Sequence, residues 1–260
     1  MTIRDIVEAI EQFAPLSIQE GWDNSGLCIG APGDEVHGVL IGFDCTPELI
    51  DEAVEKGCDM VVTHHPLIFK GLKRIQGGDP VSDAVIKAVR TGVAVYAAHT
   101  TADKVIAGVS GAMARRLGLA DIAVMEDEGG YGLGAVGDLP EPLSGEETLR
   151  YVARRFGLGV IRHSAPVPRI HRVAVLGGSG AGEMDLAWKE GAQLYISADI
   201  SYHHFFLPEG VMVMDIGHFE SEVEITDIFF SLIRKNFPTF AVRVSEALGG
   251  SNPVRYYVVK

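Results

Sequence analysis

Short apolar segments of strand length alternate with amphipathic segments of helix length along most of this 260-residue chain, and this alternation constrains the fold most strongly. The clearest helix start follows the apolar run 36–44, where Thr46 suits the N-cap and Pro47 the first helical position. We predict strands at 36–44, 59–63, 93–98, 172–176, 193–197, 211–216 and 256–259, and helices at 3–14, 47–56, 81–91, 105–117, 148–156, 184–190 and 224–236. Such alternation is typical of an α/β fold with mainly parallel strands in mixed sheets.

The chain also contains a candidate domain boundary. Residues 126–142 are rich in glycine and acidic residues and interrupt the rhythm of strands and helices. We therefore expect one α/β lobe from residues 1–125 plus 220–260, and a second from residues 126–219.

The two halves echo one another in sequence. Each has a strand, a helix that ends in a charged pair and a glycine, a further strand and a pair of histidines. A later strand in each half ends in a histidine followed four residues on by an acid: His99 with Asp103, and His218 with Glu222. A period of about 120–140 residues indicates two related lobes rather than a solenoid. Either an ancient duplication or the limited menu of α/β motifs accounts for the echo.

Composition excludes several classes of protein. The net charge of −13, from 22 basic and 35 acidic residues, argues against nucleic acid as a tightly bound partner. Cys28, Cys45 and Cys58 are odd in number and scattered, which favours reduced thiols in the cytoplasm over a disulfide framework. The first residues form an acidic amphipathic pattern unlike a signal peptide, and no apolar run approaches the roughly 18–20 residues that span a membrane.

Histidines and acids gather where predicted strands end. The apolar run 59–63 leads directly into His64 and His65. Neighbours on a straight strand point to opposite faces, but a pair at the carboxyl end can escape this because the chain is leaving the sheet. Ligands of open α/β sheets bind at these carboxyl ends. Four strand ends carry ligand-type side chains: His64 with His65, His99 with Asp103, Asp199 with His203 and His204, and His218 with Glu222.

This set of side chains favours a metal site. A single histidine at a strand end is more often a hydrogen-bonded surface or core residue, but four such clusters shift the balance. Imidazoles with carboxylates favour zinc, manganese, iron, cobalt or nickel over calcium. One carboxylate can bridge two cations about 3.5–4 Å apart, and such a pair can activate water. The pair His203 and His204 serves either local packing or the mouth of the site.

Six segments of the chain, in order, resemble the NGG-interacting-factor-three-like family, the hexameric dinuclear-metal proteins often labelled type 2 GTP cyclohydrolase I homologs. The matching segments are Trp22-Asp-Asn-Ser-Gly-Leu27, Gly42-Phe-Asp-Cys-Thr46, Thr63-His-His-Pro-Leu67, Ala98-His-Thr-Thr-Ala-Asp103, Gly177-Gly-Ser-Gly180 and Gly217-His-Phe-Glu-Ser-Glu222. The similarity runs over essentially the whole chain.

The resemblance implies a site for two metal ions in the cleft between the two lobes, and a toroidal homohexamer. It implies metal ligands at His64, His65, Asp103, His218 and Glu222, with Glu222 as the bridge. The chain departs from the family pattern at Thr101, where asparagine is usual, and at Ser197-Ala-Asp199, where Thr-Gly-Asp or Thr-Gly-Glu is frequent. Neither departure removes a ligand, but both can alter substrate contacts.

Two loops have alternative interpretations. The glycine-rich segment 177–182 lies between a strand and a helix, where backbone amides can hold phosphate. It lacks the Gly-Lys-Ser/Thr of a Walker loop, and Glu183 and Asp185 oppose an anion, so a tight turn is favoured. In the loop 22–26, Asp23 and Asn24 either stabilise a turn or supply hydrogen bonds near the site.

The leading hypothesis is a cytoplasmic hydrolase of unknown substrate that uses a metal-activated water. His99 either holds a metal ligand through a hydrogen bond or acts as the general base. Candidate substrate-binding residues are Asp23, Asn24, Asp44 and His204. The alternative is a non-catalytic metal-binding scaffold or interaction protein that forms a hexameric ring. A role in nucleic-acid processing is the weakest option, because the acidic charge opposes it.

Overall fold

The computed structural model describes residues 1–126 and 128–257, and these form two compact units. Unit 1 contains Met1–Ala102 and Ile225–Arg255, and unit 2 contains Asp103–Glu224 with Tyr256 and Tyr257. This division differs from the expected boundaries at residues 125 and 219. The reason is that β5 (Ala120–Val124) pairs with β6 (Ala135–Leu143), and α8 (His218–Glu222) packs against β8 (Ile170–Ser179). All of these strands belong to the sheet of unit 2.

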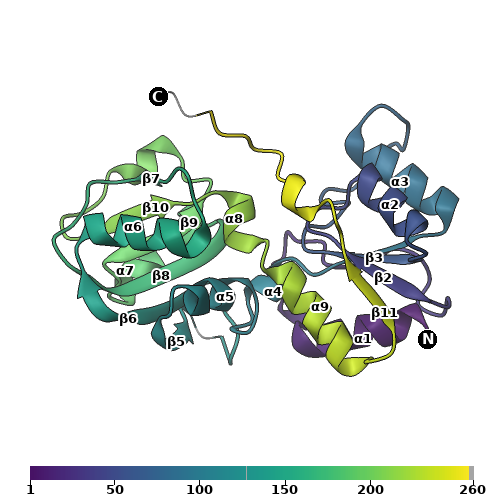
Figure 1. The fold of residues 1–260 in the computed structure, drawn as a ribbon, viewed down its shortest axis with the longest axis horizontal. Coiled ribbons are helices and arrows are strands. Elements are labelled where there is room, and N and C mark those ends of the chain that lie inside the picture. The colour runs from purple at the N-terminus through teal and green to yellow at the C-terminus, as the bar shows by residue number, and fades with distance from the viewer. Residues whose placement is uncertain (127, 258–260) are drawn as a thin grey trace. The chain divides into compact units, whose positions relative to one another are not determined.

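Unit 1 is a five-stranded sheet with helices on both faces (Figure 1). Its elements are α1 (Ile3–Phe13), β1 (Gly26–Ile29), β2 (Gly38–Ile41), α2 (Pro47–Glu55), β3 (Met60–Thr63), α3 (Pro80–Thr91), β4 (Ala94–Ala97), α4 (Thr100–Asp103), α9 (Ile225–Asn236) and β11 (Ala241–Val244), with 3-10 turns at Leu16–Ile18 and Leu248–Gly250. The strand order is β1-β4-β3-β2-β11, and every pairing is parallel except that of β1 with β4. The boundary between the units falls within α4, whose last residue, Asp103, belongs to unit 2.

The central strands of unit 1 are buried from end to end. All four residues of β2, β3 and β4 are buried, as expected for parallel strands covered on both faces. Leu40 and Val61 pack against Ile50 of α2 and further residues of α3 in one apolar cluster. The predicted start of α2 is confirmed, since Thr46 Oγ1 accepts a hydrogen bond of 3.2 Å from the Leu49 amide.

Unit 2 is built around a six-stranded mixed sheet (Figure 1). Its further elements are α5 (Val109–Arg116), α6 (Gly145–Phe156), β7 (Arg162–His163), β8 (Ile170–Ser179), α7 (Met184–Lys189), β9 (Leu194–Ala198) and β10 (Met212–Asp215), with 3-10 turns at Ala181–Glu183 and Tyr202–Phe205. The strand order is β5-β6-β8-β9-β10-β7, with β8, β9 and β10 parallel. Side chains alternate between two cores: Val173 faces the cluster with α5 and α6, and Ala174 faces the cluster with α7.

The two units share an arrangement of four strands, which agrees with the predicted pair of related α/β lobes. In unit 1 the order β1-β4-β3-β2 places an antiparallel edge strand beside the last of three parallel strands. In unit 2 the order β7-β10-β9-β8 repeats this arrangement. A short helix follows the last parallel strand in each case, α4 after β4 and α8 after β10.

Several predicted elements differ from those observed. The segment 126–142, expected to be a boundary, lies within unit 2, and β6 occupies its second half. The first residues of β6 are buried, while Pro140, Glu141 and Pro142 are exposed. The predicted strand at 256–259 is not seen at Tyr256 and Tyr257, and its last residues lie outside the described residues. The strands β1, β5, β7 and β11 escaped prediction because they are short and are partly buried or, in β7, exposed.

Two general expectations can be compared with the structure. The three cysteines are free thiols, and burial raises the pKa of Cys45 to about 12. Among the described residues, none of the helices has both the length and the apolar character that crossing a membrane requires.

Candidate metal centre

The exit of β3 brings two adjacent imidazoles close together. The backbone amides of His64 and His65 both donate to the Phe43 carbonyl, at 3.2 and 3.3 Å, so the chain has already left straight strand geometry. Thr63 Oγ1 adds a hydrogen bond of 2.9 Å to the His65 carbonyl. The two ring centroids are consequently 5.0 Å apart instead of facing opposite sides of the sheet.

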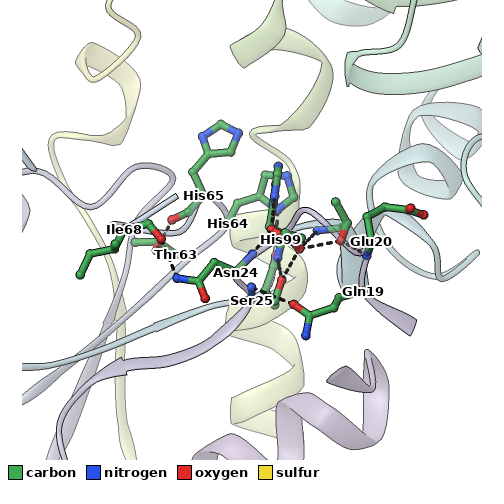
Figure 2. Close-up of polar contacts among 12 residues, drawn as sticks. Gln19, Glu20, Asn24, Ser25, Thr63, His64, His65, Ile68 and His99 are labelled. Atoms are coloured by element: carbon green, nitrogen blue, oxygen red, sulfur yellow. Dashed lines mark hydrogen bonds and ion pairs between the residues drawn. The ribbon is translucent and has the colours of Figure 1, made fainter. Parts of the chain in front are cut away.

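His99 completes a group of three histidines within unit 1. It follows β4, the strand that pairs with β3, so both strand ends reach the same edge of the sheet. Its ring centroid lies 5.3 Å from that of His64 and 5.4 Å from that of His65 (Figure 2). One ring nitrogen from each histidine lies within 4.8 Å of the other two. His99, predicted as either a hydrogen-bonding partner of a ligand or the general base, thus lies directly against both expected ligands.

Each of these histidines is anchored through Nδ1. That atom lies 3.0 Å from the Ala98 carbonyl in His64, 2.7 Å from Asp44 Oδ1 in His65, and 2.8 Å from Asp23 Oδ1 in His99. Carbonyl and ionised carboxylate oxygens accept hydrogen bonds, so we assign the proton to Nδ1 in all three rings. Nε2 is then the nitrogen that each ring can offer to a metal ion.

Asp23 is the most heavily bonded of these acceptors. It receives Thr100 Oγ1 at 2.6 Å, the Thr100 amide at 3.1 Å and Ser25 Oγ at 2.7 Å, besides the His99 ring. Burial opposes ionisation of Asp23, but these hydrogen bonds outweigh it and hold the pKa of the carboxyl well below its usual range. Asp23, a candidate substrate-binding residue, bonds protein donors through both carboxylate oxygens and orients His99.

The other loop residues also have local partners. Asn24 is exposed, and its side-chain amide donates to the Ile68 carbonyl at 2.6 Å (Figure 2). Asp44, a further substrate candidate, orients His65. Asp23, Asn24 and Asp44 were singled out because they lie in segments that match the family. The residue pattern of the loop alone fits a simple turn equally well.

Unit 2 presents a second set of donors on α8. His218 and Glu222 are one helical turn apart, and Nε2 of the histidine lies 3.0 Å from Oε2 of the buried carboxylate. Nδ1 of His218 is 2.7 Å from Asp199 Oδ2, so this ring is anchored in the same way as those of unit 1. Asp199 adopts a left-handed backbone with φ of 52°, a conformation that aspartate tolerates better than most residues.

The glycine-rich segment makes room for Glu222. β8 extends through Ser179, so Gly177 and Gly178 belong to the strand end and not to a separate loop. A β-carbon at Gly178, whose φ is 63°, would collide with the Glu222 carboxylate. Ser221 Oγ connects the same parts by accepting from the Gly178 amide at 2.9 Å and donating to the His218 carbonyl at 2.8 Å. Sequence reasoning missed this role, although the double glycine at a strand end was its signal.

The remaining candidates differ in their surroundings. Asp103 is buried at the end of α4, four residues after His99. His204 is exposed on the turn Tyr202–Phe205, and its ring bonds Ser201 Oγ at 2.8 Å.

The chemistry of the donors suits a divalent transition metal. Neutral imidazole nitrogens and carboxylates are the ligand types that zinc, manganese, iron, cobalt and nickel share. Buried carboxylates such as Asp103 and Glu222 are costly to ionise in a protein interior, and a nearby cation offsets that cost. The buried histidine and acidic groups of both units could therefore bind metal ions.

Comparison with known proteins places the chain in a family. A protein-family model described as Duf34/NIF3 (NGG1p interacting factor 3) matches residues 1–252. Proteins named GTP cyclohydrolase 1 type 2 homolog are similar: that of Clostridium acetobutylicum is 32% identical over 85% of each chain, and that of Lactococcus lactis is 32% identical over 97% of this chain and 98% of the relative. A Staphylococcus aureus hypothetical protein of known structure is 25% identical, covers 99% of each chain and has a TM-score of 0.91. The chain belongs to the Duf34/NIF3 family.

Proposed function

We propose that this protein binds two divalent transition-metal ions per chain and hydrolyses a small-molecule substrate with a metal-activated water. The proposed ligands are His64, His65, Asp103, His218 and Glu222, and the ions are drawn from zinc, manganese, iron, cobalt and nickel. The name of the relatives, GTP cyclohydrolase 1 type 2 homolog, supports a hydrolytic reaction.

The observation that carries the proposal is the anchoring of each proposed histidine ligand through Nδ1. The acceptors are Ala98 O for His64, Asp44 for His65 and Asp199 for His218. Histidines that bind metals almost always donate their other ring N–H in this way, because the bond fixes the tautomer and raises the basicity of the coordinating nitrogen. In unit 1, one ring nitrogen of each of His64, His65 and His99 also lies within 4.8 Å of the other two, so these imidazoles are close enough to share an ion.

Within this proposal the protein supplies charge and proton transfer. Bound ions would act as Lewis acids and lower the pKa of water. Glu222, as an ionised carboxylate, would bridge the ions and reduce their mutual repulsion. His99 would accept a proton at Nε2, and the ionised Asp23 at Nδ1 would stabilise the resulting imidazolium.

The proposal includes an assembly and a location. We place the protein in the cytoplasm, which its reduced cysteines favour, as a homohexamer, which the family resemblance implies. Light scattering of the purified protein tests the hexamer independently of any activity. We propose no membrane or nucleic-acid partner, in keeping with the net charge of −13.

Metal content tests the central claim. Elemental analysis of protein purified without added metal or chelator should give close to two ions per chain, and the variant His64→Ala should lose at least one. His37→Ala is the matched control, because His37 also bonds a carboxylate through Nδ1, 2.7 Å from Asp59 Oδ2, but lies at the amino end of β2. Metal-free native protein, or His64→Ala with unchanged metal content, would contradict the proposal.

Turnover is tested separately. The metal-loaded protein should hydrolyse a member of a panel of phosphoesters, nucleotides, amides and cyclic amides, and Glu222→Ala should abolish that activity. Full metal content with no turnover of any member would instead favour a non-catalytic scaffold.

A further inference from the structure

A pocket of about 490 Å³ opens in unit 1 beside the histidine group. It lies between the first turns of α2 and the segment 245–251, which follows β11. Phe43, Leu49 and Leu248 give it an apolar wall, and Asp44, Glu48 and Glu246 place carboxylates around it. Its volume lies in the range typical of small-molecule sites.

The pocket and the histidine group share two residues. Phe43 lines the pocket, its ring centroid lies 4.7 Å from that of His65, and its carbonyl accepts the amides of both adjacent histidines. Asp44 also lines the pocket and holds His65 Nδ1 at 2.7 Å. A small molecule seated here therefore touches two of the residues that position His65.

The charge of the pocket selects the sign of its ligand. Four lining residues are carboxylic acids: Asp44, Glu48, Glu52 and Glu246. The nearby ammonium of Lys56 pairs with Glu246 and lies 4.0 Å from Glu52. The positive end of the α2 dipole amounts to about half an elementary charge. Even with both positive contributions, the carboxylates leave a negative field, which attracts cations and repels phosphate.

The carboxylates differ in whether they already have hydrogen-bond or ion-pair partners within the protein. Glu52 accepts from Ser245 Oγ and from the Glu246 amide at 2.8 Å, so it ties the segment 245–251 to α2 and builds the wall. Glu48 is exposed in the first turn of α2, and among the described contacts it has no ion pair. Glu48 is therefore the carboxylate best suited to meet a ligand.

We propose that this pocket binds an organic cation: an ammonium, amidinium or guanidinium group carried on a small apolar or aromatic body. The cationic group lies among Glu48, Asp44 and Glu246, and the apolar body packs on Phe43 and Leu49. Where the cation is part of a substrate, a role that rests on the proposed hydrolase function, the pocket holds the end that is not cleaved. The substrates are then amides or esters of amine-bearing molecules, and not compounds that place a phosphate in this pocket.

The test uses three probes of matched shape on the metal-loaded full-length protein. Benzamidine is cationic, benzamide neutral and benzoate anionic, and their binding is followed by NMR titration of the protein. Benzamidine should bind at least tenfold more tightly than benzamide, and benzoate should show no saturable binding. Equal binding of the three probes overturns the proposal.

Variants locate the binding. Glu48→Gln should weaken benzamidine about threefold, the effect of one partly exposed ion pair. Ala247→Trp, at an exposed lining position, should fill the pocket and abolish binding. Glu55→Gln, an exposed acid later in α2 that does not line the pocket, is the control and should bind as the native protein does. Native affinity in both Glu48→Gln and Ala247→Trp overturns the proposal.

Metal content measured on the same samples separates this inference from the proposed function. Selective benzamidine binding by a protein that contains no metal would support the cation pocket and contradict the hydrolase proposal. Two ions per chain without benzamidine binding overturns the pocket alone. His64→Ala should keep benzamidine binding, because that side chain does not line the pocket.

Discussion

Asp23 holds the imidazole of His99 through a hydrogen bond of 2.8 Å between Oδ1 and Nδ1. The carboxylate comes from the loop before β1, and the imidazole follows β4, the strand that pairs with β1. Ser25 and Thr100 donate to the same carboxylate, so the ionised form of Asp23 is fixed before any substrate arrives. Such a pair can stabilise a proton on His99 Nε2.

Replacing Asp23 by asparagine should therefore impair turnover without removing metal. Asp23→Asn keeps the shape of the side chain but removes the charge that stabilises the imidazolium of His99. We expect kcat to fall by about 10²–10⁴-fold with unchanged metal content, the usual range for loss of general base catalysis. Asp59→Asn, at the exposed His37–Asp59 pair, is the control and should leave kcat unchanged. A full-rate Asp23→Asn enzyme would exclude His99 as the base.

The same carboxyl should make stability depend on pH. Its pKa is lowered in the folded protein from an ordinary value of 3.8, so its contribution is complete above that value. The contribution is lost as pH falls from 3.8 toward the lower folded pKa, because the unfolded chain then takes up a proton that the folded protein refuses. The difference in unfolding free energy between the native protein and Asp23→Asn should therefore shrink by about 2 kcal/mol as the pH falls through this window. Urea unfolding of both proteins at several pH values between 6 and 2 measures the difference. A constant difference across this range would contradict the lowered pKa.

Gly178→Ala tests the packing under Glu222. The new methyl group would meet the Glu222 carboxylate, and the backbone there is left-handed with φ of 63°. We expect a loss of about 2–4 kcal/mol in unfolding free energy, combining backbone strain with the steric clash, together with weaker metal binding. Gly157→Ala is the matched control, since its φ is 69° and a β-carbon there meets nothing within 4 Å. It should cost only the backbone term, about 1 kcal/mol. Equal losses of stability in the two variants, with metal content unchanged, would contradict the role of Gly178 in making room for Glu222.

Asp199→Asn tests the anchoring of His218. Asparagine tolerates the left-handed backbone at this position, so the change isolates the charge that holds Nδ1. We expect metal affinity, measured by competition with a chelator, to fall by about 10–100-fold. Asp121→Asn, at another aspartate with positive φ, controls for the backbone and should keep native affinity. Native affinity in Asp199→Asn would show that His218 needs no such partner.

Much of the fold followed from local patterns, for identifiable reasons. Thr46-Pro47 predicted the start of α2 because capping is a property of adjacent residues, and the structure confirms the cap. β6 was missed because its exposed half contains Pro140 and Pro142, while its buried half pairs with β8, which lies far along the chain. Short edge strands such as β11 acquire their pairing from the sheet, so four residues alone carry too little periodicity to reveal them.

The sequence by itself determined the α/β class, the two related lobes and the placement of histidines and acids after strands, because periodicity and strand ends are visible in local order. The family segments added the expected ligand set. Only the tertiary structure decided which carboxylate accepts the hydrogen bond from Nδ1 of each imidazole. These acceptors are Asp44 for His65, Asp23 for His99 and Asp199 for His218. Those partners are separated by about twenty to seventy-six residues. Asp44 and His65 meet because β2 and β3 are parallel, and Asp199 and His218 meet because β9 and β10 are parallel. Asp23 reaches His99 because it precedes β1, whose first residue pairs antiparallel with the last residue of β4. The role of Gly178 was decided in the same way, since it depends on a carboxylate from another element lying against its α-carbon.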